Sequence, residues 1–202
     1  MALDNKHNIS VGKSHYQDSS FRQLTGKAEY IDDIPLAENA LHGALILSTI
    51  PSGKIISINT KRAKDIDPSI TIIMAKDIPG KNDIAPIFED EPIFAEKTVT
   101  YVGQPIGLIV SSSMERARAA AKEVEVMYKK DKGPILDLES AFKKKSFFLK
   151  PIHFERGKAR EEIKRAPHRL KGSFSIGGQD HFYLETHIAL AIPHENSEFT
   201  IW

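Results

Sequence analysis

The chain has 202 residues, of which 41% are hydrophobic, and this composition is ordinary for a soluble globular protein with a buried core. Its 28 lysines and arginines nearly balance its 27 aspartates and glutamates. The net charge of +1 argues against a nucleic-acid partner or a membrane-binding surface, because such surfaces carry a strong excess of basic side chains.

The sequence contains no cysteine. It therefore excludes disulfides, thiolate zinc sites, iron–sulfur ligation and a cysteine nucleophile in this chain. No apolar run approaches the roughly 18 residues that span a bilayer, and residues 1–10 lack the apolar core of a signal peptide. These features predict a cytoplasmic protein without a membrane segment.

Short β-rich runs dominate the first half of the chain. Residues 41–57 contain two apolar runs separated by Pro51-Ser52-Gly53, which is typical turn chemistry, so they predict a pair of strands. Residues 62–67 predict one or two helical turns that end at Pro68. Residues 70–74 predict a buried strand, because the apolar run is too short for a helix.

A strand, a helix and a second strand are expected in the middle of the chain. Residues 106–110 are apolar on both faces, as in a buried strand. Ser112 and Glu115 have the spacing of a capping box, so a helix is expected to begin there and to continue to Lys122 through residues of high helix propensity. Residues 124–128 alternate in polarity with the period of a half-buried strand.

The last third of the chain predicts two short helices followed by strand-like runs. The helices are expected over residues 138–144, with Asp137 as the N-cap, and over residues 159–165. Strand-like runs follow at residues 169–176, 181–192 and 199–202. The fold class is therefore predicted to be α+β, with the start of a second sheet after residue 170.

The N-terminal segment Val11-Gly12-Lys13-Ser14 is similar to the end of a phosphate-binding loop. The Walker pattern requires a glycine five positions before Gly12, and His7 stands there. We therefore reject nucleotide binding and interpret this stretch as part of an extended N-terminal arm.

Two acidic clusters, Asp32-Asp33 and Glu89-Asp90-Glu91, are candidates for paired catalytic carboxylates or for a hard-cation site. Each lies beside a proline, and neighbouring side chains on an extended chain point to opposite sides. We therefore favour solvated loop charges over a site.

The segment from His181 to His187 has the most unusual polar pattern of the chain. On a strand, one face would carry His181, Tyr183, Glu185 and His187. Two histidines and a carboxylate are ligands typical of non-haem iron or zinc. However, residues two positions apart on one strand lie roughly 7 Å apart, too far for parallel side chains to close on one ion at about 2.1 Å. Hydrogen bonds across a domain or subunit contact are favoured over a metal site.

Gly177 and Gly178 precede Gln179 within a strand-like stretch. Paired glycines there indicate either a β-bulge or a close approach of backbone or ligand, and both alternatives stay open. The sequence contains neither Gly-x-Ser-x-Gly nor His-Glu-x-x-His. The residue pattern alone therefore supports an α+β protein with a polar strand of unassigned role.

Several segments resemble, in order, the start of the molybdopterin-binding large subunit of the xanthine dehydrogenase family: residues 25–35, 77–83, 90–95 and 101–106. Residues 177–186 read Gly-Gly-Gln-Asp-His-Phe-Tyr-Leu-Glu-Thr and are similar to that family's Gly-Gly-Gln-Glu-His-Phe-Tyr-Leu-Glu signature, with Asp180 in place of the usual glutamate. The resemblance covers nearly the whole chain from Val11 onward.

The resemblance implies three regions, which are an N-terminal arm at residues 1–11, an α/β-hammerhead domain at residues 12–145, and the incomplete start of the first molybdopterin-binding domain at residues 146–202. It implies a molybdenum–molybdopterin cofactor in the complete subunit, and iron–sulfur clusters and FAD on a small partner subunit of a hetero-oligomer. Members of this family hydroxylate purines such as hypoxanthine and xanthine at molybdenum, with a glutamate as general base. The electrons leave through iron–sulfur centres and flavin to NAD.

The motifs that build the family's active site are not found in this sequence: the Ser-Thr-Gln segment, the Gly-Gly-Gly-Phe-Gly-Gly-Lys-Glu loop, the substrate-binding arginine and aromatic clamps, and the terminal catalytic glutamate. No catalytic, cofactor-binding or metal-binding residue is therefore assigned, and Gln179 and Glu185 receive no role as ligand or base. The isolated chain is expected to bind no cofactor and to be inactive.

Two hypotheses of different class follow. In the first, the sequence is the front part of a xanthine dehydrogenase catalytic subunit, and oxidation of aldehydes by an aldehyde oxidase-type fragment is the alternative activity. In the second, it is a non-catalytic scaffold module. The apolar run at residues 199–202 favours the first, because an unpaired apolar strand edge promotes aggregation.

Overall fold

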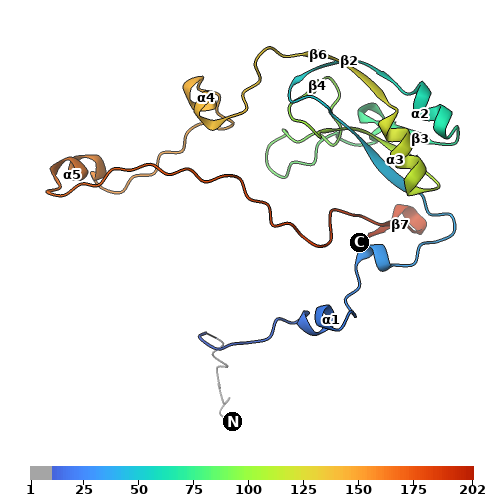
Figure 1. The fold of residues 1–202 in the computed structure, drawn as a ribbon, viewed down its shortest axis with the longest axis horizontal. Coiled ribbons are helices and arrows are strands. Elements are labelled where there is room, and N and C mark those ends of the chain that lie inside the picture. Colours follow the sequence, from blue (N-terminus) through green and yellow to red (C-terminus); the bar gives the residue numbers. More distant parts are fainter. Residues whose placement is uncertain (1–10) are drawn as a thin grey trace, which may run out of the picture. The chain divides into compact units, whose positions relative to one another are not determined.

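The computed structural model describes residues 11–202. These residues divide into two compact units, one formed by residues 37–170 and the other by residues 11–36 together with residues 171–202 (Figure 1). The second unit is therefore assembled from two segments that are distant in sequence.

The unit of residues 37–170 contains a first antiparallel sheet of three strands in the order β1–β5–β3. Its central strand is β5 (Pro105–Ser111), which is flanked by β1 (His42–Leu47) and β3 (Thr71–Met74). Ile106 and Ile109 of β5 are completely or almost completely buried. The buried strand that the apolar run predicts at residues 106–110 is thus confirmed.

A second antiparallel sheet in the same unit has the order β4–β2–β6. It consists of β4 (Thr98–Val99), β2 (Gly53–Asn59) and β6 (Glu125–Lys130). The two strands expected around the Pro51–Gly53 turn both exist, but they do not pair with each other, because β1 joins the first sheet and β2 joins the second.

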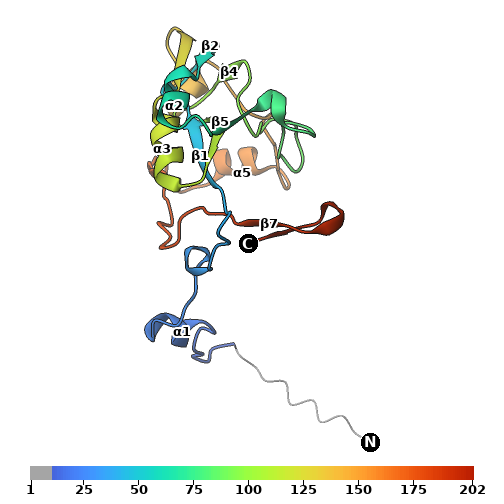
Figure 2. The same cartoon turned by 90° about the vertical axis from the view of Figure 1, so that its right-hand side faces the viewer.

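Helix α3 (Met114–Lys122) covers the first sheet, and α2 (Lys61–Ile66) lies against α3 (Figure 2). Within the sheet, α3 packs on β1 and β5. The buried faces of these helices carry the small residues Ala63, Ala117 and Ala120, none of which is exposed to solvent. Small side chains permit the close approach of helix to helix and of helix to sheet.

Helix α3 uses a different cap from the one that the sequence predicts. Its N-cap is Ser113, whose Oγ accepts a hydrogen bond from the Arg116 backbone N–H at 3.2 Å. The expected capping box of Ser112 with Glu115 is wrong by one residue. Two consecutive serines follow β5, and Ser113 has the extended backbone, with φ −143° and ψ 149°, that an N-cap requires.

The two later helices agree with the sequence prediction. Helix α4 (Leu138–Lys143) is capped by Asp137, whose Oδ1 accepts from the Ser140 backbone N–H at 2.8 Å. Helix α5 (Ala159–Arg165) ends just before the Pro167 segment. Neither helix buries a residue completely.

The unit of residues 11–36 and 171–202 contains helix α1 (Ser20–Leu24), the 3-10 helix η1 (Ile31–Asp33) and an antiparallel hairpin of β7 (Ala191–Pro193) and β8 (Phe199–Ile201). The 3-10 helix η3 (Glu195–Ser197) connects the two strands. The apolar run at residues 199–202 therefore finds a strand partner within the chain.

The strands predicted at residues 169–176 and 181–192 are wrong over nearly all of their length. The first stretch is not a strand, and only Ala191 and Ile192 of the second belong to one, as part of β7. A strand needs a neighbouring backbone for its N–H and C=O groups, and among the described residues no strand pairs with residues 169–189, whereas Leu190 exchanges two backbone hydrogen bonds with Trp202. Alternation of polarity alone does not supply that partner.

The hydrophobic core lies within residues 37–170 and joins both sheets to the helices. Its fully buried large side chains are Val99, Ile106 and Ile109. Among the described residues, no helix combines the length and the apolar character that crossing a membrane requires.

Candidate functional site

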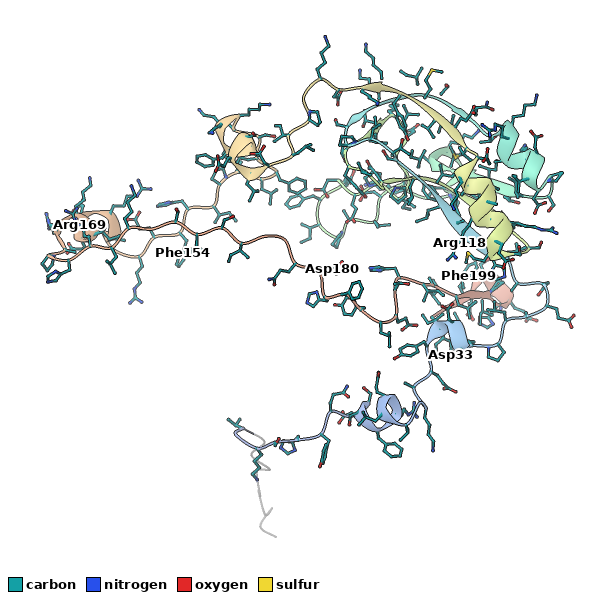
Figure 3. The ribbon with its side chains drawn as sticks, viewed as in Figure 1. Asp33, Arg118, Phe154, Arg169, Asp180 and Phe199 are labelled. Carbon is teal, nitrogen blue, oxygen red and sulfur yellow. The ribbon has the colours of Figure 1, made fainter. Side chains whose placement is uncertain are left out.

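The segment of residues 177–187 carries the most distinctive residues of the sequence, and it forms an exposed, irregular chain (Figure 3). Phe182 has a positive φ of 53°, whereas a strand requires a φ near −140°. The Asp180 carboxylate accepts a hydrogen bond from the Phe182 N–H at 3.4 Å, which supports this turn. The expected continuous face of four polar side chains therefore does not form.

The four residues of that expected face have separate environments. The rings of His181 and Tyr183 stack with their centroids 5.4 Å apart and an interplanar angle of 10°. Glu185 is directed elsewhere, since its Oε1 accepts the backbone N–H of Ile31 at 2.8 Å. Within residues 11–202, no group of three or more potential ligand side chains is placed to hold a metal ion.

Gly177 and Gly178 do not form the β-bulge that was one of their two interpretations, because this stretch is not a strand. Neither glycine has a positive φ, and a Cβ atom added to either would meet no other atom within 4 Å. The chain itself therefore does not approach these glycines closely. Their second interpretation, the approach of a ligand, stays a prediction.

The acidic clusters serve local structure. Asp33 Oδ2 accepts the Tyr30 N–H at 2.9 Å at the start of η1. Glu89 pairs with Lys81, and both side chains are mostly exposed. The exposed positions and the local partners agree with solvated loop charges.

Asn82 and Asp83 bridge two parts of a loop through hydrogen bonds that the sequence does not predict. The Asn82 side chain donates to the Phe94 carbonyl at 2.8 Å and accepts from the Phe94 N–H at 3.0 Å. Asp83 accepts from the N–H groups of Ala85 and Glu91. An Asn-Asp pair is a known signal for turns, but the sequence does not identify a partner twelve residues away.

Two surface hollows lie within the unit of residues 37–170. One has a volume of about 650 Å³ and is lined by Pro51, Ser52, Tyr101, Val102, Asp131 and Leu136, among others. The other, of about 570 Å³, is lined mainly by apolar side chains of α4 and the chain after it, including Phe142 and Phe147. In the first hollow the Asp131 carboxylate is already hydrogen-bonded by Ser52, and in the second Glu139 and Lys143 form an ion pair at 3.7 Å.

Two protein-family models match this chain. Residues 25–132 match the model described as aldehyde oxidase and xanthine dehydrogenase, a/b hammerhead domain, and residues 140–202 match the molybdopterin cofactor-binding domain. Because the first match covers more than half of the chain, the chain belongs to the aldehyde oxidase and xanthine dehydrogenase family. The predicted fold class, a hammerhead domain followed by the start of a molybdopterin-binding domain, is confirmed.

Within this family, the chain is similar to xanthine dehydrogenases in particular. It is 40% identical to xanthine dehydrogenase/oxidase of Gallus gallus over 185 residues, which cover 91% of this chain and 13% of that protein. It is 39% identical to xanthine dehydrogenase 1 of Arabidopsis thaliana, over 89% of this chain and 13% of that protein. It is also 38% identical to a nicotinate hydroxylase of Emericella nidulans, over 98% of this chain and 15% of that protein.

Solved structures of the same family share the fold. The aldehyde oxidoreductase from Desulfovibrio gigas matches with a TM-score of 0.51 and 28% identity, over 57% of this chain and 14% of that chain. Quinoline 2-oxidoreductase from Pseudomonas putida 86 matches with a TM-score of 0.54 and 26% identity, over 66% of this chain and 18% of that chain. The chain thus spans only a small part of the length of the proteins that it matches.

Proposed function

We propose that this chain is the front part of the catalytic, molybdopterin-binding subunit of a xanthine dehydrogenase, an enzyme that hydroxylates hypoxanthine and xanthine to urate. The supporting observation is the identity of 37–40% to xanthine dehydrogenases of a bird, a plant, an insect and a fungus, over about 90% of the chain. The activity belongs to the complete protein, because the chain spans 13–14% of these relatives.

In this proposal, residues 12–145 form the hammerhead domain and residues 146–202 begin the first molybdopterin-binding domain. Iron–sulfur clusters and FAD lie on a small partner subunit of a cytoplasmic hetero-oligomer, and electrons pass through them to NAD. These 202 residues have no cysteine to ligate an iron–sulfur cluster, so in this proposal the clusters lie outside them.

The molybdenum–molybdopterin cofactor supplies the oxygen transfer and takes up the electrons when it is bound. The described residues do not enclose such a group by themselves. Gln179 is exposed, there is open space beside Gly177 and Gly178, and the Glu185 carboxylate is bound to Ile31. We therefore assign none of these residues a step in the reaction, and we expect the isolated 202-residue chain to retain no molybdenum.

Hydroxylation of another nitrogen heterocycle is the second candidate. The nicotinate hydroxylase of Emericella nidulans is as similar to this chain as several xanthine dehydrogenases are. Aldehyde oxidation is the third, because an aldehyde oxidoreductase shares the fold. The choice among the three substrates depends on substrate-binding motifs that these 202 residues do not contain.

The test is to isolate the endogenous protein from its native cells with an antibody against residues 37–130 and to measure its intact mass, its molybdenum, iron and flavin contents, and its NAD-dependent turnover. The substrate panel contains xanthine, hypoxanthine, nicotinate and an aromatic aldehyde. We expect a mass well above 22.6 kDa, a co-purifying iron- and flavin-containing subunit, and the highest kcat/KM for a purine.

Each other outcome contradicts a defined part of the proposal. Preference for nicotinate or for the aldehyde would replace the substrate and retain the enzyme class. A protein of 22.6 kDa without molybdenum would exclude the enzyme and support a non-catalytic scaffold module.

A further inference from the structure

Glu185 forms a hydrogen bond with a distant segment of the chain, whereas the sequence predicts only that its polar face bonds across a domain or subunit contact, without naming a partner. Its Oε1 accepts a hydrogen bond from the backbone N–H of Ile31 at 2.8 Å, and the two residues are 154 positions apart. Ile31 is the first residue of the 3-10 helix η1. Its N–H lacks a partner within the helix, because the first N–H groups of any helix do.

The carboxylate is chemically suited to this position. The neighbouring N–H of Tyr30 is bonded in the same way by Asp33, at 2.9 Å. Two carboxylates therefore satisfy two successive backbone donors at the start of η1. Hydrogen bonds from N–H groups to an ionised carboxylate are stronger than those to a neutral acceptor.

The contact matters because little else holds these two segments together. No described residue of the unit formed by residues 11–36 and 171–202 is buried, so no hydrophobic core fixes the segments to each other. Among the described residues, the bond from Ile31 to Glu185 is the one hydrogen bond that joins the two segments. Where apolar packing is sparse, local opening costs little free energy, so the loss of one charge-assisted hydrogen bond should change the rate of opening measurably.

We propose that Glu185 is a positioning residue that fastens the segment around η1 to residues 171–202. We call its hydrogen bond with the Ile31 N–H the clamp. Residues 25–36 lie within the hammerhead family match. They nevertheless belong to the same compact unit as residues 171–202, which lie within the molybdopterin-binding match. The conspicuous glutamate of the 177–186 segment thus has a structural partner in the N-terminal part of the chain. This inference does not rest on the proposed function.

The test is hydrogen–deuterium exchange of the 202-residue chain, resolved to the amides of η1. In Glu185→Ala, the exchange of the Ile31 amide should become about tenfold faster, because its acceptor is removed. In Glu185→Gln, the amide oxygen replaces the carboxylate oxygen as acceptor, so most of the protection should return. The matched control is Glu195→Ala, since the exposed Glu195 carboxylate makes no hydrogen bond or ion pair among the described residues. It should leave the Ile31 amide unchanged.

A variant at the other end of the bond gives an independent test. Ile31→Pro removes the donor, and proline is tolerated at the first position of a helical turn, particularly after the extended Tyr30 (φ −107°, ψ 169°). The amides of Asp33 and Ile34 should exchange faster in this variant, and adding Glu185→Ala should cause no further increase. Amides of β1 and β5 serve as the reference for intact folding and should not change in any variant.

Wild-type exchange at Ile31 in Glu185→Ala would overturn the clamp. Equal acceleration in Glu185→Ala and Glu185→Gln would also overturn it, because the loss would then not depend on an acceptor oxygen. Since these readouts require neither cofactor nor turnover, their failure leaves the enzymatic proposal unaffected, and failure of the enzymatic proposal leaves the clamp intact.

Discussion

The carboxylate of Asp67 organises a buried junction within the unit of residues 37–170. Asp67 is 5% exposed and stands directly after α2. Its Oδ1 accepts from the backbone N–H and the hydroxyl of Ser69, at 2.9 and 2.6 Å, and its Oδ2 accepts from the hydroxyl of Ser111 at 2.8 Å. The network connects the end of α2 to the end of β5.

These hydrogen bonds, first from Ser69 and then from Ser111, hold the pKa of Asp67 below its ordinary value. Because the folded-state pKa is lower than the unfolded value of about 3.9, the ionised group stabilises the fold above about pH 4. This contribution is lost as the pH falls through the folded-state pKa. Protonation of Asp67 therefore contributes to acid unfolding.

We predict that Asp67→Asn lowers the Tm at pH 7 by several degrees and reduces the loss of Tm between pH 5 and pH 2. An asparagine cannot accept all three hydrogen bonds with its oxygen, and it carries no charge to lose in acid. Thermal unfolding followed by circular dichroism at a series of pH values measures both effects. Asp65→Asn, on the exposed side of α2, is the control. A difference in Tm between Asp67→Asn and the wild type that is the same at every pH would refute the assignment.

At the scale of elements, β5 determines the arrangement of the first sheet. It pairs with β1 on one side and β3 on the other, and Gly107 lies opposite both Ile46 and Met74. A Cβ atom at Gly107 would lie 2.8 Å from the carbonyl oxygen of Ile73 and even closer to the sulfur of Met74. The close approach of β3 therefore requires glycine here.

Gly107→Ala should destabilise the chain by about 1–3 kcal/mol, because the strands must separate or the Met74 side chain must move. The matched control is Gly80→Ala, where an added Cβ would meet nothing within 4 Å, and its effect should stay within about 0.5 kcal/mol. Urea unfolding should be followed by far-UV circular dichroism, since the single tryptophan, Trp202, lies in the other unit. Equal midpoints for the two variants would show that β3 and β5 do not depend on this glycine.

At the scale of the whole molecule, the two units differ in how they are held together. The unit of residues 37–170 has a hydrophobic core that involves both sheets, α2 and α3. Residues 145–170 of that unit contribute nothing to this core and are almost all exposed. Resistance to local opening should follow this distribution of buried apolar contacts.

Limited digestion of the 202-residue chain with trypsin should therefore cut after Lys145 and Arg156 well before it cuts after Arg118. Arg118 is exposed, but it lies within α3, which packs on β1 and β5. A protease needs a locally unfolded segment, and α3 opens only when the core opens. Mass spectrometry of the first products identifies the order. Digestion of the heat-unfolded chain is the control, and similar rates at all three sites in the native chain would contradict the expected difference.

The sequence by itself determined the family and the short local elements. The helices at residues 138–143 and 159–165 and the buried strand β5 follow from caps, helix propensity and apolar runs, which are properties of neighbouring residues. The family followed from ordered motifs spread along the chain, and the family match confirms it. Composition and residue spacing by themselves indicate only an α+β protein.

Only the tertiary structure decided which distant parts meet. It separated β1 and β2 into different sheets, left residues 169–189 without a strand partner, and directed Glu185 to the N–H of Ile31 instead of to a polar strand face. The reason is physical: a backbone or carboxylate hydrogen bond between distant residues depends on how the intervening chain folds. Local sequence determines which groups can bond, whereas the tertiary fold determines which of them come within bonding distance.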